Sequence, residues 1–221
     1  MNLIIIILSV SLILLLFILF KYFSNNSTKL IKQSSLLTSN AIIPVTMNPS
    51  ATRYAFGIWV YVKSWNNNIK TIFEYPGKIK VYLDAISPTL CVSISTTVDN
   101  PTIIKLTQNF PSQKWTYISV SVDNSYIDSY IDGKLIKSIK IEGLQSNYTD
   151  SNIYLGGKVN NPSDIQISNF LRWTNALTPQ DVWNEFNKGN GGNWMKSIFS
   201  QYGLDLNLKK DSNIAATLNL I

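Results

Sequence analysis

The sequence predicts an all-β protein built as an antiparallel two-layer β-sandwich, and two observations support this fold class. Short segments in which apolar and polar residues alternate recur along the chain, the clearest being YAFGIWVYVK from Tyr54 onward. Turn residues separate these segments, as at Pro76-Gly77 and Asp132-Gly133. Regularly spaced short strands with turns between them are typical of antiparallel sandwiches rather than of parallel α/β sheets.

The alternating segments predict where the strands lie. In the first segment Phe56, Ile58 and Val60 share one face, and Trp59 and Tyr61 share the other, because successive side chains of a strand point to opposite sides. Residues 42–45 are a candidate first edge strand. We expect further strands at residues 70–75, 78–84, 90–97 and 102–106, and a hairpin that begins at Trp115.

One short helix is predicted after the strands, at residues 179–188. Thr178 suits the N-cap position, and Asp181 three residues later completes a capping-box arrangement. Pro179 is favoured in the first helical turn, and Gly189 suits the position just after the helix. The helix therefore has a defined start and end. Its apolar face is made by Val182, Trp183 and Phe186.

The N-terminus carries a long apolar stretch that begins at Leu3 and ends at Phe20, with Lys21 directly after it. The stretch contains no charged residue, glycine or proline. As a helix it would extend roughly 27 Å, close to the ~30 Å hydrocarbon core of a bilayer. No basic residue precedes it and no small-residue cleavage site follows, so we expect an uncleaved transmembrane anchor rather than a signal peptide.

These features divide the chain into four parts. A linker is indicated by serine, threonine and asparagine together with breaks at Pro44 and Pro49. We expect a transmembrane anchor at 1–23, the linker at 24–52, the sandwich at 53–190, and at 191–221 a C-terminal tail that packs on the sandwich or on a partner.

The residues next to the apolar stretch predict its orientation. Lys21, Lys29 and Lys32 follow it and no lysine or arginine precedes it, which favours a folded domain in the cytoplasm. The single cysteine, Cys91, cannot form a disulfide within the chain, as is typical of a reducing compartment. The sequons at Asn25, Asn26 and Asn147 would permit glycosylation if the domain were luminal. The predicted localisation is a single-pass membrane protein facing the cytoplasm.

Charge gives little support to a nucleic-acid partner. The net charge is +6, but the lysines, Lys70 and Lys78 among them, are scattered along the chain without a basic run. We interpret them as residues that keep the surface solvated.

The available side chains argue against catalysis. The chain contains no histidine, which removes the usual general base and the commonest zinc ligand. Glycosidases use two carboxylates about 5–9 Å apart, whereas Glu74, Glu142 and Glu185 each stand alone in the sequence. We therefore expect a protein that is not an enzyme, with glycoside hydrolysis as the least favoured alternative.

Two kinds of binding site remain open. Asp99, Asp123 and Asp150 could supply oxygen ligands to calcium, although aspartate is also a common turn residue, so we expect no cofactor. A carbohydrate site would need exposed aromatic rings beside polar groups. The best local candidate is Trp65, which is followed by Asn66, Asn67 and Asn68.

Several motifs resemble those of one family. WTYISVSVD at 115–123, YIDGKL at 130–135, NIYLGG at 152–157 and ISNFLRWTNALTPQDV at 167–182 occur in this order. This pattern resembles the laminin-G-like, concanavalin-A-like jelly-roll family over roughly residues 54–189. The resemblance implies a jelly-roll sandwich with a closing helix. It also implies relatives that bind calcium at a loop rim and relatives that hydrolyse glycosides.

One departure from the family pattern suggests a source. Residues 167–170 read ISNF where the family often has an acidic step, and this version is similar to laminin-G-like proteins of large cytoplasmic DNA viruses. The similarity implies a membrane-tethered binding module in a virion.

Three functions follow from the sequence and the resemblance. The first is a membrane-anchored, non-catalytic recognition or structural module of a virion membrane or capsid, whose partners are the lipid bilayer and capsid or membrane proteins. The second is a carbohydrate-binding, lectin-like module displayed on a membrane. The third is a glycoside hydrolase whose two carboxylates come from distant residues.

Overall fold

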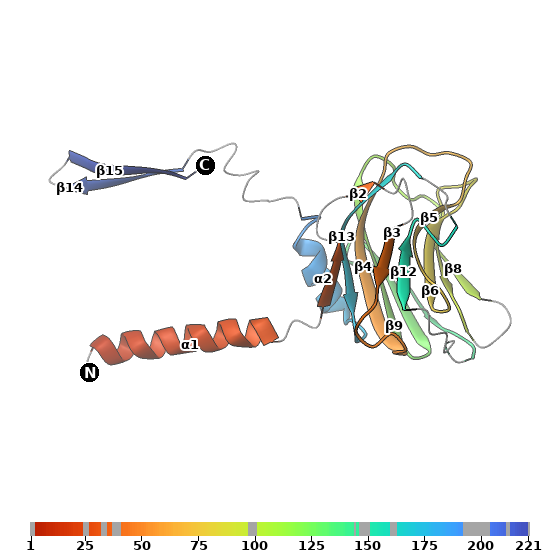
Figure 1. Cartoon of the computed structure of the whole chain (residues 1–221), viewed down its shortest axis with the longest axis horizontal. Coiled ribbons are helices and arrows are strands. Elements are labelled where there is room, and N and C mark those ends of the chain that lie inside the picture. Colours follow the sequence, from red (N-terminus) through yellow and green to blue (C-terminus); the bar gives the residue numbers. More distant parts are fainter. Residues whose placement is uncertain are drawn as a thin grey trace.

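The computed structural model describes residues 3–23, 27–31, 35–36, 41–96, 101–143, 145, 151–159, 163–191, 204–210 and 213–220. Most of these residues form two antiparallel sheets packed face to face (Figure 1). The first sheet contains, in spatial order, β1 (Ser27–Ile31), β13 (Ile165–Trp173), β4 (Arg53–Val62), β9 (Trp115–Asp123), β10 (Tyr126–Ile131) and β11 (Lys134–Lys140), with β2 (Ser35–Leu36) also paired to β13. The second contains β3 (Ala41–Pro44), β12 (Asn152–Leu155), β5 (Lys70–Tyr75), β6 (Ile79–Leu83), β7 (Leu90–Ile94) and β8 (Thr102–Thr107).

The main core lies between the two sheets and follows the alternation of the sequence. Phe56, Ile58 and Val60 of β4 point inward and are buried, as predicted. At the centre Phe56 meets Phe73 of β5 and Phe170 of β13, with ring centroids 5.1 and 6.0 Å away. The all-β antiparallel sandwich is therefore confirmed.

The segment predicted as a linker contributes to the sandwich. Strands β1 and β2 pair with β13, and β3 pairs with β12, so three strands lie within residues 24–52. The candidate edge strand at 42–45 corresponds to β3, which forms one edge of the second sheet. The sandwich thus begins well before residue 53.

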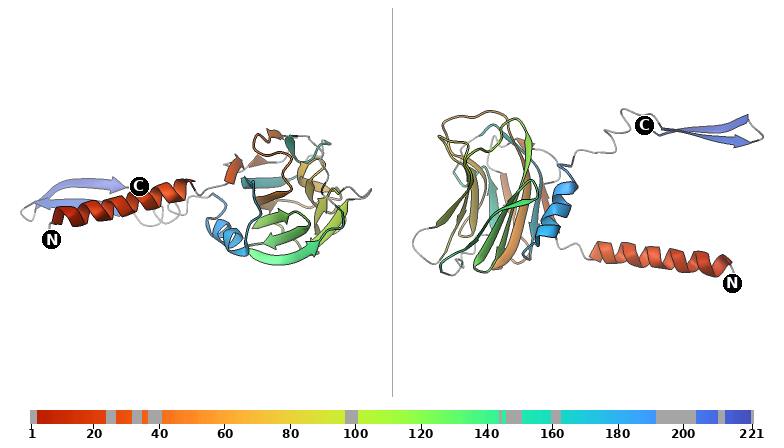
Figure 2. Two further views of the ribbon diagram at one scale, coloured as in Figure 1. Left: turned by 90° about the horizontal axis from the view of Figure 1, so that it is seen from below. Right: turned by 180° about the vertical axis from the view of Figure 1, so that it is seen from behind.

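Helix α2 (Pro179–Asn187) begins with the predicted capping box. The Asp181 amide donates to Thr178 Oγ1 at 3.3 Å, and the Thr178 amide donates to the Asp181 carboxylate at 3.0 Å. The helix lies against the first sheet on the side away from the second sheet (Figure 2). There Val182 is buried, and the Phe186 ring stacks on Trp59 with centroids 5.6 Å apart. We call this smaller core, built from Trp59, Tyr117, Tyr130 and Val182, the outer cluster.

One helix and a two-stranded hairpin are drawn outside the sandwich (Figure 1). Helix α1 (Leu3–Phe23) covers the apolar stretch, and the large apolar side chains described between residues 7 and 19 are exposed. Within the part of the chain that the structure describes, no helix combines the length and the apolar character that crossing a membrane requires. At the other terminus β14 (Leu204–Lys210) and β15 (Asn213–Leu220) pair with each other as an antiparallel hairpin.

The first testable prediction concerns Gly57, which lies beneath the outer cluster. A Cβ at this position would overlap the Tyr117 hydroxyl and approach the Trp173 ring to 3.0 Å. We expect Gly57→Ala to lower the free energy of unfolding by about 1–3 kcal/mol through overpacking, measured by denaturant titration.

Tyr117→Phe in the Gly57→Ala background should recover part of that loss, because it removes the atom with the worst overlap. Tyr130→Phe provides the matched control, since Tyr130 belongs to the same cluster but is not among the nearest contacts of the new Cβ. Equal recovery by both variants would contradict the steric explanation.

Candidate functional site

The outward side of the second sheet is the main candidate for a binding surface. Helix α2 covers part of the outer side of the first sheet, whereas no helix among the described residues covers the second sheet (Figure 2). Along β6 the residues at 79, 81 and 83 are buried, and Lys80 and Tyr82 between them are partly exposed. We call this surface the open face. It consists of Glu74, Lys80, Tyr82, Ser93, Ile103, Lys105 and Tyr154.

The strand register arranges these residues in rows across the sheet. Glu74 lies opposite both Tyr154 and Lys80, and Lys80 in turn lies opposite Ser93. In the neighbouring row Tyr82 lies opposite Cys91, and Cys91 in turn lies opposite Lys105. Aromatic, hydroxyl, carboxylate and ammonium groups therefore share one uncovered sheet surface.

Cation–aromatic contacts recur on this face. The Lys80 ammonium lies 5.8 Å from the Tyr82 ring centroid, and the Lys158 ammonium lies 5.9 Å from that of Tyr154. The Glu74 carboxylate accepts a hydrogen bond of 3.0 Å from the Lys158 amide. Burial and the neighbouring Cys91 raise the pKa of Tyr82, so its hydroxyl is a proton donor at neutral pH. The face can both stack against a ligand and exchange hydrogen bonds with it.

The predicted carbohydrate residues lie together in the loop between β4 and β5. Asn66, Asn67 and Asn68 are exposed, whereas Trp65 is half-buried and packs against the main core. The ammonium of Lys70 lies 4.4 Å from the Trp65 ring centroid. The loop therefore presents amide groups to solvent and directs much of its aromatic ring inward.

Lys70 organises this loop, and the sequence interpretation missed it. The residue is fully buried, and its ammonium donates to the carbonyls of Asn66 at 2.6 Å and Asn68 at 3.1 Å. Burial lowers its pKa. The expectation that the lysines belong to a solvated surface is wrong for Lys70. The available signal was its position at the start of an apolar strand.

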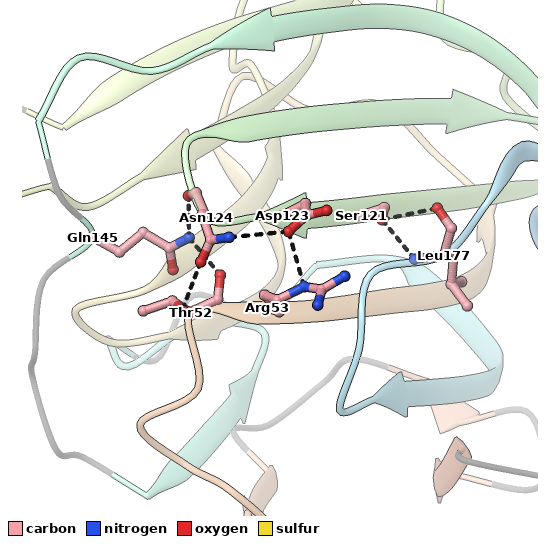
Figure 3. A network of polar contacts seen from close by, with 7 residues as sticks. All are labelled: Thr52, Arg53, Ser121, Asp123, Asn124, Gln145 and Leu177. Atoms are coloured by element: carbon pink, nitrogen blue, oxygen red, sulfur yellow. Dashed lines mark hydrogen bonds and ion pairs between the residues drawn. The ribbon is translucent and has the colours of Figure 1, made fainter.

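The residues considered for calcium are only partly described. Asp99 and Asp150 lie outside the described residues. The Asp123 carboxylate forms an ion pair with Arg53 at 2.9 Å and accepts a hydrogen bond from the side-chain amide of Asn124 at 3.2 Å (Figure 3). Among the residues that the structure describes, no three acidic or cysteine side chains gather where a metal could bind.

Polar contacts around Asp123 fasten strand ends rather than forming a site (Figure 3). The side-chain amide of Gln145 donates to the backbone carbonyls of Thr52 at 2.9 Å and Asn124 at 2.6 Å. Further along β9 the Ser121 hydroxyl donates to the Leu177 carbonyl at 3.2 Å and accepts from its amide at 2.8 Å. These contacts join β4, β9 and the segment that leads into α2.

Comparison with known proteins identifies relatives of this sandwich. The family described as the concanavalin A-like lectin/glucanases superfamily matches residues 35–183. No curated protein matches the sequence.

Among solved structures, similar folds occur in botulinum neurotoxins. One is neurotoxin type C, which enters cells in a manner dependent upon interaction with two ganglioside molecules (TM-score 0.56, 17% identity, 67% of this chain and 39% of that chain). Another is the serotype D ligand binding domain in complex with N-acetylneuraminic acid (TM-score 0.59, 18% identity, 71% and 42%). A third is the neurotoxin DC binding domain in complex with rat synaptotagmin II (TM-score 0.57, 17% identity, 71% and 42%). The match spans less than half of each toxin chain, and at this identity it shows a shared fold.

The second prediction tests the role of Lys70. Replacement by methionine removes the donor that holds the carbonyls of Asn66 and Asn68, so we expect amide hydrogen exchange at residues 64–69 to rise several-fold. Lys80→Met on the open face is the matched control and should leave exchange in this loop unchanged. Unaltered exchange in Lys70→Met would show that the loop is held by other contacts.

Proposed function

The chain belongs to the concanavalin A-like lectin/glucanases superfamily, and we propose that it is a non-catalytic, lectin-like recognition module attached to a membrane. The observation that carries this proposal is the open face. Sugars offer apolar C–H surfaces and many hydroxyl groups, so they suit a surface that combines aromatic rings with donors and acceptors. Tyr82 and Tyr154 supply the rings, and Glu74, Lys80 and Ser93 supply the polar groups.

The same face supports recognition rather than hydrolysis. Glu74 is the single carboxylate among the residues that define the open face, whereas glycoside hydrolysis uses a pair of carboxylates. The absence of histidine from the sequence removes the commonest alternative acid and base. Neurotoxin structures of similar fold that bind N-acetylneuraminic acid or depend on gangliosides support a glycan as ligand.

The third prediction locates the glycan site. We expect the full chain to bind to one or more of the glycans on a printed array. Tyr82→Ala and Tyr154→Ala should each weaken titrated binding of the best of them about tenfold, because losing an aromatic anchor costs more than about 1.4 kcal/mol.

Tyr126→Ala is the matched control, because Tyr126 is an exposed tyrosine on β10 of the first sheet. Its ring centroid lies 6.0 Å from the Lys140 ammonium, so it has a similar cation–aromatic contact. Binding should survive this change. If Trp65→Ala abolishes binding while both open-face variants retain it, the site is the Trp65–Asn68 loop instead. If the protein binds to no glycan on the array, the lectin proposal is overturned.

Protein recognition is the second candidate function, and the proposed orientation favours it. Lys21, Lys29 and Lys32 support a domain that faces the cytoplasm, where glycan ligands are scarce. A similar toxin fold in complex with rat synaptotagmin II supports the use of this sandwich for protein partners. In a virion, the setting that the viral resemblance implies, the partners would be capsid or membrane proteins.

Membrane attachment through α1 is the remaining part of the proposal. It is supported by the uncharged sequence from Leu3 to Phe20 and by the exposure of large apolar side chains between residues 7 and 19. Apolar side chains without a protein cover are stabilised by lipid.

The fourth prediction tests this attachment and its direction. In a flotation assay the full chain should rise with liposomes, and a variant lacking residues 1–23 should stay at the bottom. In sealed microsomes the folded domain should be digested by added protease, and Asn147 should stay unmodified. A protected domain glycosylated at Asn147 would reverse the orientation and strengthen the glycan proposal over the protein one.

A further inference from the structure

Two buried cations lie at one end of the main core, between the sheets. Arg172 of β13 is 2% exposed, and Lys78 in the turn between β5 and β6 is 1% exposed. Two buried tyrosines, Tyr54 of β4 and Tyr75 of β5, complete what we call the cationic cluster. The expectation of a solvated Lys78 is therefore wrong, because the fold turns this side chain inward.

One short segment of backbone covers the cluster. Residues 47–51, here called the strap, connect β3 to β4. Five consecutive carbonyls of the strap each accept a hydrogen bond from the cluster. Arg172 donates to residues 47 and 48 at 2.7 and 2.9 Å, Tyr75 donates to residue 49 at 2.8 Å, and Lys78 donates to residues 50 and 51 at 3.3 and 3.1 Å.

No acid among the described residues balances the charge of the cluster, because no salt bridge joins Arg172 or Lys78 to a carboxylate. Burial and the neighbouring Arg172 lower the pKa of Lys78, and burial lowers that of Arg172, so each cation is held at a cost in desolvation. Among the described residues, the two cations are instead opposed by the partial negative charges of the strap carbonyls and, for Lys78, by the Tyr54 ring, whose centroid lies 6.0 Å from the ammonium.

The cluster also offers more donors than the strap uses. The Tyr54 hydroxyl and Arg172 Nε are buried and have no hydrogen-bond partner in the part of the chain that the structure describes. A buried polar group without a partner has lost its hydrogen bonds to water without replacing them, which destabilises the folded state. Both groups belong to side chains that are at least nine-tenths buried. The donor set is therefore suited to a ligand with more acceptor oxygens, or more negative charge, than the strap supplies.

The strap itself is a thin cover. Met47, Asn48 and Ser50 are exposed, and Asn48 adopts a left-handed backbone conformation with φ +45°. Its neighbour Val45 is buried and fixes one end. Little apolar surface holds the strap between that point and β4, so its hydrogen bonds to the cluster supply much of its attachment.

We propose that the cationic cluster is an oxyanion-binding site and that the strap occupies it in the absence of ligand. A carboxylate, sulfate or phosphate group would replace the strap carbonyls. The two terminal nitrogens of Arg172 form a fork that matches two oxygens of such a group. Lys78 and Tyr75 would bind the remaining oxygens, and Tyr54 would gain a partner. This site uses residues that point inward, so it does not depend on the glycan proposal for the open face.

The fifth prediction tests this site with inorganic sulfate as the probe. In the full chain, sulfate should raise amide hydrogen exchange at residues 46–52, and sodium chloride of equal ionic strength should not. Sulfate generally strengthens apolar burial, which slows exchange, so a local increase has the opposite sign to that effect. Acetate and N-acetylneuraminic acid, used in parallel, distinguish a general oxyanion site from one that requires an acidic sugar.

The variants separate binding from folding. Tyr54→Phe removes only a hydroxyl without a partner among the described residues, so the protein should fold normally. The sulfate concentration that gives half of the exchange response should rise about tenfold, the loss expected for one hydrogen bond to a charged group. Arg172→Lys keeps the charge without the fork and should abolish the response. Arg53→Met, at the chain's other arginine, should retain it. The proposal would be overturned if sulfate does not change amide hydrogen exchange at the strap in the parent chain, or if sulfate changes it equally in Arg172→Lys.

Discussion

The packing of three phenylalanines between the sheets is the contact on which the rest of the structure depends. Phe73 of β5 meets Phe170 of β13 at 4.9 Å and Phe56 of β4 at 5.1 Å, so one cluster joins both layers. Because a strand has a period of two, fixing these rings inward also fixes which residues point outward. The open face on one side and the α2-covered face on the other are both consequences of this register. A slip of one residue would exchange Tyr82 with the core.

Local patterns in the sequence were sufficient for most strands and for the helix. At Asp132-Gly133 both residues adopt positive φ, as the predicted turn requires, and the Asp132 carboxylate also accepts from the Tyr117 amide at 2.9 Å. Within residues 24–52, β3 was predicted as an edge strand, whereas β1 and β2 were not. These two strands are short, and their partner β13 lies more than a hundred residues away, so their pairing is decided by long-range contacts rather than by local alternation.

The surroundings of charged residues were the least predictable feature. In the sequence, Lys78 follows Pro76-Gly77 and resembles any solvated turn lysine, and Lys70 follows three asparagines and an isoleucine. Whether such a side chain points into solvent depends on which carbonyls the folded chain brings within reach. Composition singled out the segment from Trp65 to Asn68 as a loop, but it gave no indication that Lys70 would lie over the Trp65 ring. Burial of a long cationic side chain leaves no periodic signal in the sequence.

The energetics of the cationic cluster give the clearest reason to look for function there. A sandwich needs only apolar residues at inward positions, and replacing buried charges with apolar residues of similar size is often neutral or stabilising. Among the described residues, Arg172 and Lys78 have no acidic partner at such positions, and the buried Tyr54 hydroxyl has no hydrogen-bond partner. A purely structural strap could be held at lower cost by apolar contacts. A guanidinium fork, an ammonium and the Tyr75 phenol converge on one stretch of carbonyls, and the Tyr54 phenol beside them has no hydrogen-bond partner among the described residues. This donor set has a clearer purpose as a receptor for anionic oxygens that the strap keeps closed.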